Sequence, residues 1–104
     1  MHLGLLTAKR PGRLPADFAA QCERAMDNVE ALLAAAEMTT ANIVKLSYYA
    51  TRATDFPTLV QIRQWRWAFE PAPSVTAIAV SAVARPEYLI EIEAVAIDSM
   101  EQSP

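Results

Sequence analysis

The feature that most constrains the fold is the apolar run at residues 88–97, YLIEIEAVAI. In an extended chain, successive side chains point to opposite faces. One face of this run is then apolar, with Tyr88 at its start, while the other carries Glu91 and Glu93 among apolar neighbours. Two carboxylates two residues apart lie on the same side and feel each other's charge. We therefore expect the first face in the core and the second against water, a cation, a donor-rich pocket or another subunit.

Size and composition indicate one oligomeric domain. A chain of 104 residues is near the common domain size, so we expect residues 1–104 to form a single domain. Apolar residues make up 53% of the chain and charged residues only 20%, which is more apolar material than so small a domain can bury. Without a leader pattern or an apolar run near ~20 residues, we expect no membrane contact and a cytoplasmic location.

Charge and the rare residue types exclude several classes of site. The net charge is −3 and the nine Lys and Arg are scattered, so no basic patch for nucleic acid is expected. His2 is the single histidine and Cys22 the single cysteine. We predict no metal site and no internal disulfide, and we interpret Cys22 as a small buried hydrophobe.

The first helix is predicted from Asp17 to Ala36, where apolar residues recur at steps of three and four. Asp17 can cap its start, since Pro15 prevents an earlier one. Gln21 and Asn28 are assigned to the flank of its solvated face.

A second helix is predicted over residues 57–69, with Asp55 as its cap and Pro57 in its first turn. Trp65 joins the side expected to pack, and Trp67 points elsewhere. Packing between helices or subunits is favoured over base stacking for both tryptophans.

Three further strands complete the pattern, at residues 1–8, 42–51 and 74–83. The second alternates, with Val44 and Leu46 on an apolar face and Ser47 and Tyr49 on a more polar face that suits either a pocket or an exposed edge. The third is apolar on both faces, as expected for a strand with a layer on each side. The order of elements predicts an α+β fold with two helices packed on one face of a mixed sheet.

The residues that fill this order resemble the RidA (YjgF-like, endoribonuclease L-PSP-like) family. The matching stretches are residues 21–36, residues 42–45, Asp55-Phe56 and residues 89–96. The resemblance implies a chorismate-mutase-like fold and a homotrimer with clefts between subunits. It also implies hydrolysis of small imine or enamine metabolites to a carbonyl product and ammonia, without a cofactor.

The resemblance also assigns site residues. Glu91 corresponds to the glutamate that positions the attacking water, and Glu93 to a second family carboxylate. The family's carboxylate-binding arginine falls on Val75, or on Pro73 if Pro71-Ala72 is the anchor. The family's amino-terminal hairpin is reduced to residues 1–8, and Glu37 stands at a usual glycine.

Two functions follow as hypotheses. The first is an enzyme acting on a neutral or cationic imine, with Glu91 as the catalytic base and Val75, Thr76, Tyr49, Ser47 and Glu93 around the substrate. The second is a non-catalytic trimer that binds a small ligand or serves as a scaffold. Whether Arg52, Arg66 or Arg85 replaces the missing arginine is left open. Ribonuclease activity is the weakest hypothesis, because the sequence shows no basic groove.

Overall fold

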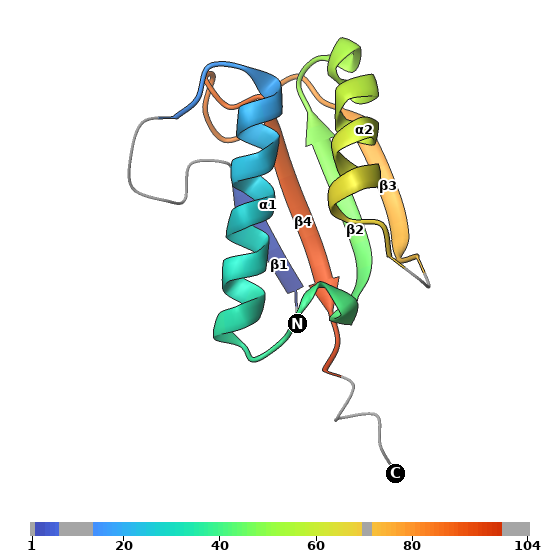
Figure 1. Ribbon diagram of the computed structural model, residues 1–104. Coiled ribbons are helices and arrows are strands. Elements are labelled where there is room, and N and C mark those ends of the chain that lie inside the picture. Colours follow the sequence, from blue (N-terminus) through green and yellow to red (C-terminus); the bar gives the residue numbers. More distant parts are fainter. Residues whose placement is uncertain (1, 7–13, 70–71, 99–104) are drawn as a thin grey trace.

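The chain folds into a four-stranded mixed sheet with both helices on one face (Figure 1). The computed structural model describes residues 2–6, 14–69 and 72–98. In chain order the elements are β1 (His2–Leu6), α1 (Phe18–Ala35), β2 (Ile43–Ala50), α2 (Phe56–Arg66), β3 (Ser74–Ala79) and β4 (Ile90–Ala96). The strand order is β1-β4-β2-β3, with β4 antiparallel to both neighbours and β3 parallel to β2. The predicted α+β class is confirmed.

Strand β4 has the alternation that the sequence predicts. Ile90, Ile92, Ala94 and Ala96 are fully buried on the helix side, while the residues between them are half-buried on the other side. Figure 1 shows α1 lying in front of β4, and the two elements are in contact. The rest of the core is supplied by α1 (Phe18, Cys22, Ala25, Met26, Val29, Leu33), β2 (Ile43, Leu46, Tyr48, Ala50) and α2 (Leu59, Ile62), together with Met38 and Trp67.

Helix α1 begins and ends with recognisable caps. At the start, Asp17 Oδ2 accepts a hydrogen bond from the Ala20 amide at 3.3 Å, as predicted. At the end, the Met38 amide donates to the Leu33 carbonyl and the Glu37 amide to the Ala34 carbonyl, which is a Schellman motif. The motif holds Glu37 at φ 60°, a conformation that costs a residue with a Cβ about 1 kcal/mol relative to glycine.

Helix α2 is shorter than predicted and reverses the roles of the two tryptophans. It ends at Arg66, and Trp67 leaves the helical conformation with φ −124° and ψ 60°. Trp67 is consequently 4% exposed and packs in the core, while Trp65 is 69% exposed. The predicted orientation of both was wrong, and for Trp67 the reason is that the 3.6-residue period stops before it. Asp55 is the N-cap residue but its side chain accepts from Arg52 Nε at 2.8 Å instead of capping.

Two strands depart from the predicted pattern. The register between β2 and β4 shifts between Ile43 and Lys45, and this irregularity buries Ile43 while leaving Val44 42% exposed. The assignment of Val44 to the buried face was therefore wrong. Strand β3 ends at Ala79 and lies at an edge of the sheet, and all six of its residues are exposed. The two covering layers predicted for it are not present within one chain.

Some expectations concern residues outside the described ranges, including residues 1, 7 and 8 of the first predicted strand and the side chain of His2. In the part of the chain that the structure describes, no helix has the length and apolarity needed to cross a membrane.

Candidate functional site

Five of the six predicted site residues share the face of the sheet that carries no helix. Glu91 and Glu93 alternate with the buried residues of β4 and so point away from the helices. Strand pairing places Tyr49 opposite Glu91, and Ser47 opposite Glu93. Thr76 of β3 lies opposite Ser47 on its other side. Directly opposed residues on paired strands lie on the same face, so the five residues form two adjacent rows across the sheet.

Val75 does not join this group. It pairs with Leu46, which is 1% exposed in the core, and it lines a hollow of about 200 Å³ on the helix side together with Trp67. Neighbouring residues of a strand point to opposite faces, so Val75 and Thr76 cannot contact one ligand on one face of the chain. The structure thus places Val75 and Thr76 on opposite faces of the sheet, and their roles at a substrate stay a prediction.

Glu91 and Glu93 line a small hollow of about 190 Å³, called here the Glu91 hollow. Its lining residues are Tyr49, Val80, Ala82, Val83, Glu91 and Glu93. Three of them belong to the segment after β3, where the Val80 amide donates to the Ala50 carbonyl at 2.9 Å. The sequence analysis missed this segment as a pocket wall, because its small apolar residues continue the pattern of the strand before it.

Burial and charge both act on Glu91. Burial, and after it the negative charge of Glu93, raises the pKa of the Glu91 carboxyl above its ordinary value. Tyr49 donates its phenolic hydrogen bond to Glu93 Oε1 at 3.4 Å. A carboxylate with a raised pKa is a stronger base, which suits it to accept a proton from a water molecule.

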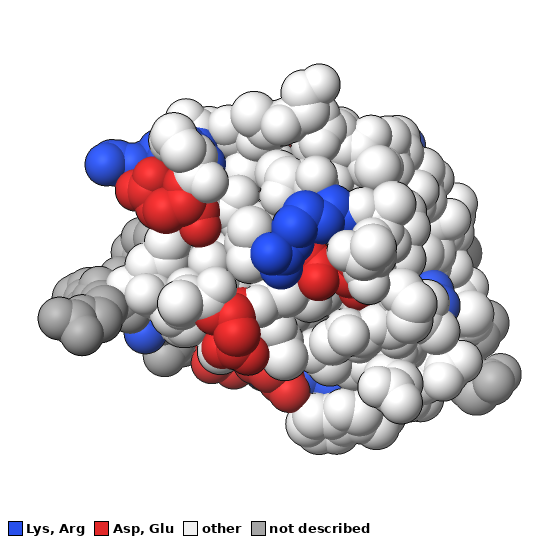
Figure 2. Space-filling model, turned by 90° about the horizontal axis from the view of Figure 1, so that it is seen from above, with Lys and Arg blue, Asp and Glu red and all other residues white. Residues whose placement is uncertain are grey.

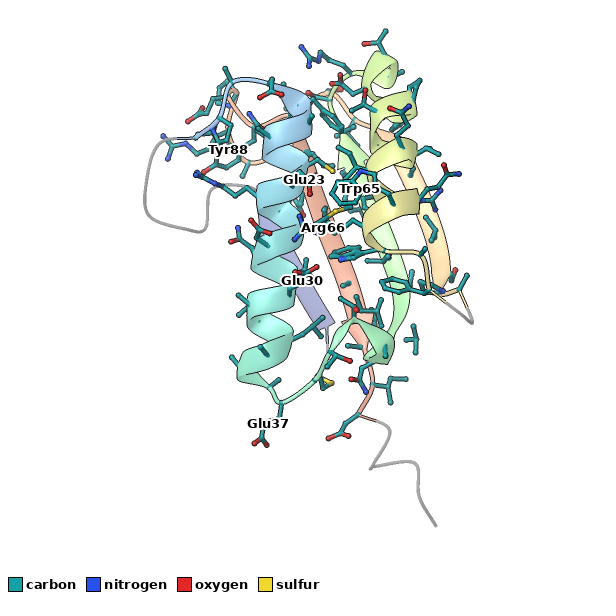
Figure 3. All side chains as sticks on the ribbon, in the orientation of Figure 1. Glu23, Glu30, Glu37, Trp65, Arg66 and Tyr88 are labelled. Carbon is teal, nitrogen blue, oxygen red and sulfur yellow. The ribbon has the colours of Figure 1, made fainter. Side chains whose placement is uncertain are left out.

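The three arginines left open by the sequence analysis all bind carboxylates elsewhere. Arg66 lies between the helices (Figure 3), where its side chain is 15% exposed. It binds the α1 carboxylates Glu23, Asp27 and Glu30, a set called here the Arg66 cluster. Arg52 pairs with Asp55 at 2.8 Å and Arg85 with Glu87 at 3.0 Å. The described residues that line the Glu91 hollow include no Lys or Arg.

Gln21 supports the approach to β4 and was misplaced by the sequence analysis. It is 1% exposed, not on the flank of a solvated face. Its Nε2 donates to the Pro15 carbonyl at 2.9 Å and the Glu87 carbonyl at 3.0 Å, and its Oε1 accepts from the Leu89 amide at 2.8 Å. Its spacing of three residues from Phe18 was the available signal, since that spacing places both on one side of a helix.

Cys22 is fully buried, and burial, followed by the charge of Glu23, raises its pKa to about 12, so it is a buried neutral thiol as predicted. Within the described ranges, no three His, Cys, Asp or Glu gather as a metal site. Figure 2 shows the end of the molecule where both helices begin, and there basic and acidic side chains are interspersed instead of forming a basic patch.

The fold and the site together define a class of small α+β protein in which a mixed sheet carries helices on one face and paired carboxylates on the other. The chain belongs to the family described as Endoribonuclease L-PSP, whose model matches residues 4–98. The resemblance seen in the sequence is thereby confirmed.

Characterised relatives and solved structures agree with this assignment. The chain is 31% identical over 90 residues to the 2-iminobutanoate/2-iminopropanoate deaminase of Escherichia coli K12, covering 85% of this chain and 70% of the relative. The crystal structure of E. coli TdcF with bound serine matches with a TM-score of 0.75 at 27% identity, over 84% of this chain and 69% of that one. A YjgF/YER057c/UK114 family member from Mycobacterium tuberculosis matches with a TM-score of 0.74 at 28% identity, over 79% and 69% of the two chains.

Proposed function

We propose that this protein hydrolyses small imines or enamines to a carbonyl product and ammonia in the Glu91 hollow. The observation that carries the proposal is Glu91 itself, a half-buried carboxyl of raised pKa that opens into a hollow on the helix-free face. Membership of a family with an imine deaminase among its relatives supports the reaction class.

The proposed reaction needs water, a base and hydrogen-bond donors, and no cofactor. Water attacks the carbon of the C=N bond while the Glu91 carboxylate accepts one of its protons. The Glu91 carboxyl returns that proton to the nitrogen of the resulting carbinolamine, and the C–N bond breaks as ammonia leaves. The Glu91 carboxylate then accepts the hydroxyl proton as the oxygen becomes the carbonyl. The hydroxyl group of Tyr49, which lines the hollow, would orient the reacting groups, while Ser47 and Thr76 lie on the same face in the row of Glu93.

We also propose that further copies of the chain complete the site in a homotrimer. The Glu91 hollow, at about 190 Å³, is smaller than the roughly 300 Å³ at which ligand pockets begin. Strand β3 is exposed along its whole length and has no charged residue, an arrangement that natural sheets avoid unless the edge is covered. The expected mass in solution is that of three protomers, and the mass of a single protomer would contradict this proposal.

The single domain over residues 1–104 and the cytoplasmic location stay predictions.

The reaction is tested by measuring ammonia release from imines that an amino-acid oxidase or an amine oxidase produces in the assay. We expect release above the oxidase-only rate, and a fall of about 100-fold or more for Glu91→Gln, the usual range for loss of a general base. Glu37→Gln is the matched control, because it removes the same charge at the far end of α1 (Figure 3). No acceleration for any imine contradicts the proposal.

The second function, a non-catalytic trimer that binds a small ligand, is favoured by one observation. Among the described residues that line the hollow, no lysine or arginine stands in for the arginine that the family resemblance leads us to expect. A ligand that binds only the folded protein raises its melting temperature. A metabolite screen by thermal shift that finds such a ligand, with no turnover of any imine, would support this function instead.

A further inference from the structure

We infer that a second hollow, on the helix side of the sheet, binds a small carboxylate that carries an apolar aromatic group. This hollow is lined by the end of α2, the residues that follow it and the start of β3, and we call it the Arg63 hollow. Val75 and Leu46 place it on the opposite face of the sheet from the Glu91 hollow. The inference therefore does not depend on the proposed function.

The first support is a cation in the wall of the hollow. Arg63 lies in the last turn of α2, is half-buried and lines the hollow beside Gln64. Burial raises the pKa of the Tyr48 hydroxyl, and the positive charge of Arg63 acts against that rise, so the guanidinium acts on the interior. A guanidinium presents a planar fork of N–H donors that matches a carboxylate, and such charge-assisted pairs are among the stronger hydrogen bonds.

The second support is the aromatic part of the wall. Trp67 and Phe69 both line the hollow, and their rings stack with centroids 6.0 Å apart and ring planes at 26°. The Trp67 indole N–H already donates to Glu30 Oε2 at 2.8 Å, so tryptophan offers the hollow its ring and not its donor. Val75 adds an aliphatic side chain that is 38% exposed. An apolar ring bound here would be removed from water and would meet other rings, and both effects stabilise a complex.

The third support is room for such a ligand. The Arg63 hollow measures about 200 Å³, and a second hollow of about 420 Å³ shares with it Ala68, Phe69, Ala72 and Pro73. The larger of the two exceeds the roughly 300 Å³ at which ligand pockets begin. Its wall continues to Val44, which is 42% exposed. A ligand whose carboxylate binds Arg63 can therefore extend its apolar group along the shared wall.

The test is a titration of the full chain followed by Trp67 fluorescence, with Trp65→Phe to remove the exposed indole. Three probes share one body and differ in charge: 3-phenylpropanoate, 3-phenylpropanamide and 3-phenylpropylammonium. We expect 3-phenylpropanoate to change the Trp67 emission and to bind more tightly than the other two by about tenfold or more, because it alone forms the charge-assisted pair. Equal affinities, or no change in emission with any probe, overturn the inference.

Two substitutions of Arg63 separate ligand binding from helix stability, since a cation in the last turn also stabilises a helix. Arg63→Gln should abolish the preference for the carboxylate, whereas Arg63→Lys keeps the charge without the fork and should retain part of it. Arg52→Gln is the matched control, because the Arg52 side chain is 53% exposed and pairs with Asp55 just before α2 begins. A preference that survives Arg63→Gln overturns the inference.

Two further measurements test other occupants of the hollow. Glu70 lies outside the described residues, so the titration is repeated with Glu70→Gln, and we expect an affinity equal to or above that of the unchanged protein. Binding that appears only in Glu70→Gln overturns the inference, because the chain's own carboxylate then holds Arg63. We also expect an affinity that does not depend on protomer concentration. An affinity that falls as the protomer concentration rises overturns the inference in favour of a second copy of the chain in the hollow.

Discussion

Replacing Arg66 by methionine should destabilise the protein by about 2–3 kcal/mol, because Arg66 is the one cation of a cluster with three carboxylates. Its guanidinium contacts Glu23, Asp27 and Glu30, with an N···O distance of 3.1 Å to Glu30, and it also donates to the Glu23 backbone carbonyl at 3.1 Å. The substitution keeps most of the apolar stem and removes the charge. The carboxylates then repel one another across the gap between α1 and α2.

The magnitude follows from the exposure of the partners. The Arg66 side chain is 15% exposed, but the carboxylate side chains of Glu23, Asp27 and Glu30 are 34%, 45% and 41% exposed. Solvent screening therefore limits each pair to about 1 kcal/mol, the upper end for exposed pairs. The sum lies below the 3–5 kcal/mol for breaking a fully buried pair.

The assay is equilibrium urea unfolding, followed by tryptophan fluorescence at a fixed protomer concentration because association also contributes to stability. Trp67 is a suitable probe, since it is 4% exposed and its indole Nε1 donates to Glu30 Oε2 at 2.8 Å, while Trp65→Phe removes the exposed background. Arg85→Met is the control, because Arg85 is 65% exposed and forms an exposed ion pair with Glu87. A loss for Arg66→Met no larger than that of the control would refute the reasoning.

Two further predictions concern single glutamates. Glu37→Gly should stabilise the protein by about 1 kcal/mol in urea unfolding, because glycine adopts the positive φ of Glu37 without strain, whereas Glu37→Ala should give no such gain. Glu91→Gln should raise the melting temperature above that of the unchanged protein, and this increase should be larger at pH 7 than at pH 4. Burial, and after it the charge of Glu93, raises the folded-state pKa of Glu91 above its ordinary value, so the stability present at low pH is lost as the pH rises through the folded-state pKa. An equal change at both pH values would contradict this second prediction.

Local sequence patterns predicted much of the fold. The alternation of residues 90–96 depends only on neighbouring residues along one strand, and it held at every position of β4. The helical spacing and the cap at Asp17 likewise predicted α1. Because face assignment follows from this alternation, the sequence also placed Glu91 and Glu93 together on the side opposite the core.

The tertiary structure decided what depends on interruptions of period and on contacts between distant segments. The end of α2 before Trp67 and the register shift near Ile43 each changed which side chain is buried, and neither has a proline or glycine to signal it. Pairing with Leu46 placed Val75 on the helix side. The sequence by itself determined the class of fold and the acidic face, since both follow from local periodicity. The walls of the Glu91 hollow and the partners of Arg66 were decided by the tertiary structure, because they join segments far apart in the chain.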